Sequence, residues 1–172
     1  ASSPAVAATP AAAARLAGGD WRLVWAKSDE GIGAIGTGLH RVPLAKLEDV
    51  FVSLDQRRVT VTEVIRVMGP FPNVKNVLYG AASVSPAKLS VSYDKVVDGT
   101  GSVITSSQAR DAAFRVAGLS SRLMVLAAAT ASGDEWLVFE REAEFAASLE
   151  KLRVLPNDGE DADDDAAAAG GF

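Results

Sequence analysis

Apolar and polar residues alternate through most of the chain between positions 20 and 141, which is the pattern of half-buried β-strands. The clearest run covers residues 58–68, where Val59, Val61, Ile65 and Val67 share one face and arginine and threonine occupy the other. Further strands are expected at residues 20–27, 50–55, 74–85, 89–94, 103–104, 122–131 and 135–141. About eight short strands at hairpin spacing predict an antiparallel sheet that closes into a barrel or curves strongly.

Helical periodicity is sparse by comparison. Three short helices are expected, at residues 43–50 with Pro43 in the first turn, at 108–117 and at 142–152. The predicted fold class is therefore mainly β, an antiparallel β-barrel with a few short helices.

Composition divides the chain into three parts. Residues 1–18 are mostly alanine, with too few large apolar groups to anchor a core, so we expect a disordered transit-peptide remnant or linker. The barrel domain is expected at residues 19–155. Residues 156–172 form an acidic tail rich in alanine and glycine, for which we also expect no fixed structure.

The net charge of −5 comes from that tail. Six of the 22 acidic residues lie between Asp158 and Asp165, and the other 16 stand against 17 basic residues. A nearly neutral body argues against binding to a nucleic-acid backbone. The chain has no cysteine and a single histidine, His40, so a thiolate nucleophile and a multi-histidine metal site are excluded. His40 has a structural rather than a catalytic interpretation, and no metal site or cofactor is expected.

The segment from Gly31 to Gly36 has the spacing of a dinucleotide-binding loop, with Asp55 at a suitable distance beyond it. Asp29 and Glu30 would place carboxylates against a phosphate, and no βα alternation follows. A glycine-rich loop without a nucleotide is therefore the favoured interpretation.

Glu63 lies on the apolar face of residues 58–68, so it would be buried and would need a partner. Lys95 continues the face of Leu89, Val91 and Tyr93, which makes a Glu63–Lys95 or Glu63–Arg pair inside the barrel one prediction. An anchor for a ligand head group, a structural ion pair and a bulge that turns Glu63 outward stay open.

Residues 70–76 place Phe71 between two prolines, which force an extended backbone with few donors. We expect a rigid corner at the mouth of the barrel, with Phe71 packed inward beside Trp21 or Trp25. Asn73 and Asn76 would bond free backbone groups there.

The sequence Met68-Gly-Pro-Phe-Pro-Asn-Val-Lys-Asn-Val-Leu-Tyr-Gly80 resembles the signature of the plastid lipid-associated protein, or plastid fibrillin, family. Residues 20–25, 89–94 and 133–139 resemble the family's opening strand, the strand after the signature and the closing strand, so the likeness covers about residues 18–141. One departure is residues 126–134, which lack the two arginines that many relatives carry before the closing strand.

The resemblance implies a lipocalin-like barrel without catalysis, located in the chloroplast at thylakoids or plastoglobules. It implies a function in binding or organising carotenoids, prenylquinones or lipids, with peripheral membrane association. The alternative is an accessory protein with a filled barrel that docks on a photosynthetic or other plastid complex. Candidate ligand-binding residues are Trp21, Trp25, Glu63, Phe71, Tyr93, Lys95 and Trp136. The residues expected to shape the signature are Gly69, Pro70, Pro72, Asn73, Asn76 and Gly80.

Overall fold

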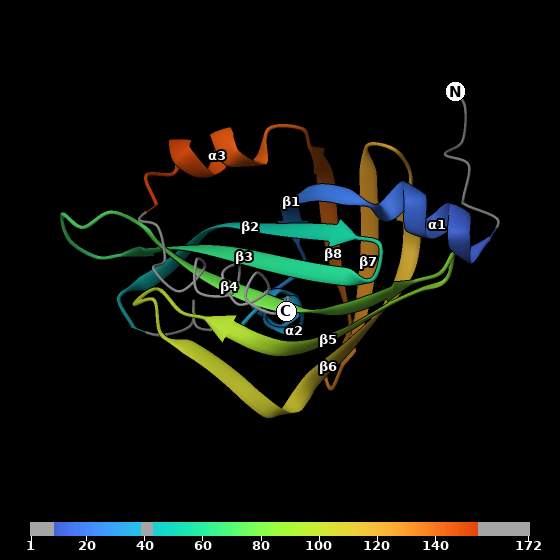
Figure 1. Cartoon of the computed structure of the whole chain (residues 1–172), viewed down its shortest axis with the longest axis horizontal. Coiled ribbons are helices and arrows are strands. Elements are labelled where there is room, and N and C mark those ends of the chain that lie inside the picture. Colours follow the sequence, from blue (N-terminus) through green and yellow to red (C-terminus); the bar gives the residue numbers. More distant parts are fainter. Residues whose placement is uncertain (1–8, 39–42, 155–172) are drawn as a thin grey trace, which may run out of the picture.

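The computed structural model describes residues 9–38 and 43–154 and has the expected architecture, a closed antiparallel barrel of eight strands in sequential order (Figure 1). The strands are β1 (Gly19–Ala26), β2 (Ala45–Asp55), β3 (Arg58–Val67), β4 (Val74–Val84), β5 (Lys88–Val97), β6 (Val103–Leu119), β7 (Leu123–Thr130) and β8 (Gly133–Glu142). The three helices are α1 (Pro10–Ala17), α2 (Asp29–Ile35) and α3 (Phe145–Lys151). The mainly β prediction and the closed barrel are confirmed.

Two expected helices are strands instead. Residues 43–50 lead into β2, which pairs with β3 from Ala45 onward, and residues 108–117 belong to the 17-residue strand β6. In both places the pairing with neighbouring strands outweighs a weak helical period. The third expected helix is confirmed as α3, whose Phe145 ring packs against Phe51 on the outer face of β2, with ring centroids 5.1 Å apart.

The N-terminal part differs from the expected disorder of residues 1–18, because residues 10–17 form α1. Thr9 caps this helix with its side chain, Pro10 occupies its first turn, and Ala13 and Ala17 are buried against the barrel core. Small side chains are what allow a helix to lie this close to a sheet. Residues 1–8 and the acidic tail lie outside the described residues.

Side chains fill the interior of the barrel. The inward positions of the strands form one apolar cluster, and its large members are almost fully buried. They include Trp21, Val52, Val61, Leu78, Leu89, Tyr93, Phe114, Leu126, Leu137 and Phe139. An eight-stranded barrel has room for its side chains or for one small ligand, and here aromatic and aliphatic groups from every strand share that space.

Candidate functional site

Helix α1 covers the barrel opening formed by the start of β1 and the end of β8. Trp21 donates from Nε1 to the carbonyl of Ala17 at the end of this helix, at 2.7 Å. The guanidinium of Arg141 lies 3.9 Å above the Trp21 ring and donates to the carbonyls of Leu16 and Gly18. A cation on the C-terminal carbonyls of a helix satisfies groups that would otherwise lack partners.

The opposite opening is covered by α2, which contacts β1, β7 and β8. Tyr93 donates from its hydroxyl to the carbonyl of Ile35 at 2.8 Å, and Arg110 lies 5.7 Å from the Tyr93 ring. Arg110 donates to three carbonyls at the end of α2, those of Gly33, Ala34 and Gly36. Both openings are therefore closed by a short helix, a stacked arginine and an aromatic side chain with a polar atom.

The expected glycine-rich loop is in fact this helix. Gly31 and Gly33 lie inside α2, whereas a phosphate-binding loop places its glycines before a helix. Asp29 and Glu30 occupy the first turn of α2. Its compact glycines let α2 approach the sheet, since a Cβ on Gly31 would meet the side chains of Glu135 and Leu137 at 3.2 and 3.3 Å.

Glu63 is fully buried on the inward face, as predicted. Its carboxylate accepts hydrogen bonds from the backbone N–H of Thr37, at 2.7 Å, and from the Thr37 hydroxyl. The expected ion pair with Lys95 is not formed, because β5 has a bulge between Tyr93 and Lys95 that turns the lysine outward. Glu63 therefore fastens the segment after α2 to the barrel wall.

Among the seven candidate ligand-binding residues, three lie inside the barrel: Trp21, Glu63 and Tyr93. The other four lie outside it: Trp25, Phe71, Lys95 and Trp136. Trp25 is 53% exposed because a bulge between Leu23 and Trp25 reverses the alternation of β1. Trp136 pairs with Ala127 on the outer face of β8, where Arg115 lies 5.0 Å from its ring.

The prediction for Phe71 is wrong, since its side chain is 68% exposed and does not pack on Trp21 or Trp25. The β3–β4 ladder ends at the pair Ile65–Val74, so the loop between them extends past the rim and finds no barrel surface to pack on. The Phe71 ring instead lies over Gly69, whose positive φ of 122° favours glycine.

The signature asparagines bond to backbone groups of distant segments. Asn73 donates to the carbonyl of Leu152 at 2.8 Å, and Asn76 accepts from the N–H of Gly99 at 2.8 Å. Gly80 sits at a bulge where a Cβ would overlap the backbone of Ser92. Pro70 and Pro72 are exposed on either side of Phe71. The signature therefore fixes the loop to α3 and to the β5–β6 turn.

An exposed apolar cluster, which we call the apolar tip, lies on this loop and the adjoining start of β2. It consists of Leu44, Val67, Met68 and Phe71, exposed by 68, 36, 70 and 68%. The Met68 N–H donates to the Leu44 carbonyl at 3.0 Å, which joins the two segments. Figure 1 shows the loop between β3 and β4 extending beyond the rest of the barrel at the left.

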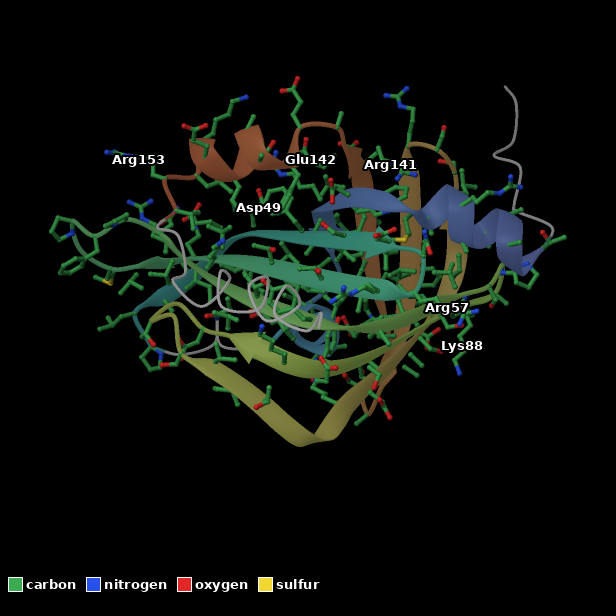
Figure 2. The ribbon with its side chains drawn as sticks, in the orientation of Figure 1. Asp49, Arg57, Lys88, Arg141, Glu142 and Arg153 are labelled. Atoms are coloured by element: carbon green, nitrogen blue, oxygen red, sulfur yellow. The ribbon has the colours of Figure 1, made fainter. Side chains whose placement is uncertain are left out.

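Three basic residues lie on one side of the apolar tip. Lys46, Arg66 and Arg153 are exposed, and the two arginines line a groove of about 310 Å³ beside Phe71. Glu48 also lines this groove, with its Oε1 atom buried without a hydrogen bond and 4.0 Å from the Arg66 guanidinium. Figure 2 places Arg153 near the end of α3, far from Arg141 at the α1 end. Apolar side chains with cations beside them are typical of surfaces that meet lipid headgroups.

Comparison of the chain with protein families, curated proteins and solved structures finds no match. No helix among residues 9–38 and 43–154 is long and apolar enough to span a membrane. The fold and the candidate site therefore rest on the geometry of this chain alone.

Sequence reasoning missed the two arginines that close the barrel and the exposure of the tip. Arg110 and Arg141 carried no signal, because a capping contact between residues more than 70 positions apart has no local pattern. The exposure of Leu44 and Met68 could have been predicted, because Leu44 follows Pro43 and Met68 precedes Gly69. Both lie at the end of a strand, where an apolar side chain has no paired neighbour.

Proposed function

We propose that this chain is a non-catalytic plastid protein that attaches peripherally to thylakoid or plastoglobule surfaces and organises apolar molecules there from its outer surface. The observation that carries the proposal is the apolar tip, in which Met68 and Phe71 project beyond the barrel rim and remain exposed. The likeness of residues 68–80 to the plastid fibrillin signature supports the plastid location and the class of lipid.

The filled interior favours the outer surface over an internal cargo site. Trp21 and Tyr93, two of the aromatic residues that could line a ligand cavity, instead bond to the helices that close the two openings. A carotenoid or prenylquinone in the interior would have to displace packed side chains and at least one closing helix. Such a ligand can meet the tip without any change in the barrel.

The charges around the tip support a lipid surface with anionic headgroups. Insertion of Phe71 and Met68 removes apolar surface from water, which contributes roughly 1.5–3 kcal/mol for each fully buried side chain. Arg66 and Arg153 line the groove beside Phe71, and Lys46 is the strand partner of Arg66, so these cations can meet phosphate or sulfonate groups beside the tip. Each basic residue near an anionic membrane contributes about 1 kcal/mol.

Flotation of the protein with galactolipid vesicles, with and without phosphatidylglycerol, tests this proposal. We expect binding that increases with the anionic lipid and falls about tenfold in Phe71→Ser, since tenfold corresponds to about 1.4 kcal/mol. Leu123→Ser is the matched control, because Leu123 is also exposed, by 43%, but lies at the opposite rim. Equal binding of the two variants would contradict a lipid contact at the tip.

Absence of flotation with every vesicle would favour the alternative function, docking on a plastid protein complex. Native purification followed by organic extraction and mass spectrometry separates both from an internal carrier. We expect no stoichiometric pigment or quinone in the purified protein. A ligand that persists in Phe71→Ser at one per chain would contradict the outer-surface proposal.

A further inference from the structure

The groove beside the apolar tip contains an acceptor atom for which the fold supplies no donor. The Oε1 atom of Glu48 is buried and accepts no hydrogen bond from the described residues. The guanidinium of Arg66 lies 4.0 Å from it, which is too far for a hydrogen bond. A buried carboxylate oxygen without a donor costs free energy, and a ligand in the groove that carries a donor group would remove that cost.

A β-bulge directs Glu48 into the groove. Leu47 pairs with Ile65 and Asp49 pairs with Val64, so Glu48 is the extra residue of β2 and has no partner on β3. Such bulges are frequent next to functional sites, because the additional residue re-aims a side chain. The position of Glu48 in the groove is therefore a property of the strand register.

The walls of the groove come from three segments that are fastened to one another. The strands supply Glu48 and Arg66, the loop 69–73 supplies a second wall, and the end of α3 supplies the third. Asn73 joins the last two by donating to the carbonyl of Leu152 at 2.8 Å. The two prolines of the loop restrict its backbone further. The groove is thus formed before any ligand arrives, and its volume of about 310 Å³ suits one sugar ring.

Arg153 occupies a backbone conformation that favours glycine. Its φ is 53°, and it directly follows Leu152, the C-cap of α3, at the position where helices most often end in glycine. Figure 2 places Arg153 at this end of α3, and its exposed side chain lines the groove. Backbone conformations of this kind cost stability and concentrate at binding sites. The strain at Arg153 therefore points to a role for its guanidinium.

The polar groups of the groove select the chemistry of the ligand. A phosphate or carboxylate offers acceptors alone, which suit Arg66 and Arg153 but meet the negative charge of Glu48. A hydroxyl group both donates and accepts, so neighbouring hydroxyls of one ring can satisfy the carboxylate and the two guanidinium groups together. The C–H groups on one face of a sugar ring also suit the electron-rich face of the exposed Phe71 ring.

We propose that this groove binds one hexose ring through its hydroxyl groups. Glu48 accepts hydrogen bonds from the sugar, Arg66 and Arg153 donate to it, and the Phe71 ring packs against its C–H face. The sugar belongs either to a free glycoside or to the headgroup of a galactolipid. The second source rests on the proposed function, because insertion of the tip brings the groove to the depth of the headgroups.

Amide spectra of the full chain, recorded without vesicles, test the site itself. The probe is methyl β-galactoside, and inorganic phosphate is the comparison. We expect the glycoside to shift the amide signals of Glu48, Asn73 and Arg153 in a saturable way, with a dissociation constant on the order of millimolar. Absence of saturable shifts with the glycoside, or saturation by phosphate instead, would overturn the proposal.

Two variants separate sugar binding from stability. Glu48→Met keeps the length of the side chain and removes the acceptor, so it should weaken glycoside binding about tenfold without lowering the melting temperature. Arg153→Gly suits the positive φ, so it should also fold normally while it weakens binding several-fold. The matched control is Glu140→Met, which removes an exposed carboxylate at the α1 end of the barrel. Unchanged affinity in Glu48→Met would contradict the assigned acceptor.

Flotation distinguishes the two sources of the sugar. Vesicles of digalactosyldiacylglycerol and of phosphatidylcholine both lack net charge, and a headgroup site predicts a preference for the first that Glu48→Met abolishes. A preference that Glu48→Met retains, although it no longer binds the glycoside, would assign the groove to a free glycoside. The amide spectra contain no vesicle, so failure there leaves lipid binding through Phe71 intact, and failure of all flotation leaves the sugar site intact.

Discussion

The two openings of the barrel are closed in the same way by unrelated segments. At one, α1 presents its last carbonyls to Arg141 and Ala17 accepts from Trp21. At the other, α2 presents its last carbonyls to Arg110, and Ile35 accepts from Tyr93. The last carbonyls of a buried helix need hydrogen-bond donors as partners, and an arginine stacked on an aromatic ring provides several donors at once.

The two ends differ in what else they contain. The α2 end has the buried carboxylate of Glu63, bound to Thr37 just after the helix. The rim at this end also bears the apolar tip, with Met68 and Phe71 exposed beyond the last strand pair. Both ends close the barrel. The α2 end additionally bears the apolar tip, which is the candidate for contact with a surface.

Truncation of either closing aromatic should have the largest effect. We expect Trp21→Ala and Tyr93→Ala each to lower the free energy of unfolding by about 3–5 kcal/mol, because each removes a buried ring and a helix contact. Urea unfolding followed by circular dichroism measures both. A cost below about 1 kcal/mol at one end would break the equivalence of the two closures.

The glycines after the two helices provide a sharper contrast. A Cβ on Gly36 would overlap the Glu63 carboxylate, whereas a Cβ on Gly18 meets its nearest atom at 3.4 Å. Both glycines have negative φ, so only the space around them differs. We expect Gly36→Ala to cost about 1–3 kcal/mol and Gly18→Ala to stay within about 0.5 kcal/mol. Similar values in urea unfolding would show that the Glu63 contact adds nothing.

Much of the fold follows from the alternation of residues, because strand pairing and burial of one face are set by local sequence. The strands at 58–67 and 74–84 were predicted within a residue of their observed ends. Two of the positions that failed, Trp25 and Lys95, lie where a bulge reverses the alternation. A bulge is selected by the register of the neighbouring strand, and that information is not local.

The candidate site was predicted less well than the fold. Burial of Glu63 followed from its place among valines, but its partner Thr37 lies in a segment with no strand or helix pattern. Phe71 was expected inside because a large apolar residue is usually buried. Its exposure depends on where the β3–β4 ladder ends relative to the rim of the barrel. The residues around Phe71 in the sequence carry no information on that position.

High pH should distinguish the two closures, since only one of them contains an ionisable aromatic group. Burial raises the pKa of the Tyr93 hydroxyl well above its ordinary value near 10. The stabilisation is complete below pH 10 and is lost above it, where the unfolded chain ionises and the folded chain does not. Relative to Tyr93→Phe, the unmodified protein should lose about 1.4 kcal/mol per pH unit above pH 10. Parallel pH profiles in urea titrations would contradict this.

The smallest effect on stability is expected at the tip. Phe71→Ser should change the free energy of unfolding by less than about 0.5 kcal/mol, because the ring is mostly exposed and lies over Gly69. The same substitution should lower vesicle binding about tenfold. Thermal melts beside flotation measure both quantities. A large loss of stability would mean that the ring packs inward in solution.

The most direct test of the outer-surface account is a polarity-sensitive dye placed at the tip. The absence of cysteine allows Phe71→Cys and the control Leu123→Cys to be labelled at one position each. On addition of galactolipid vesicles containing phosphatidylglycerol, the dye at position 71 should shift to shorter wavelength and brighten, whereas the dye at position 123 should not change. Vesicle binding that leaves the dye at position 71 unchanged would contradict the central claim that this protein works through its apolar tip.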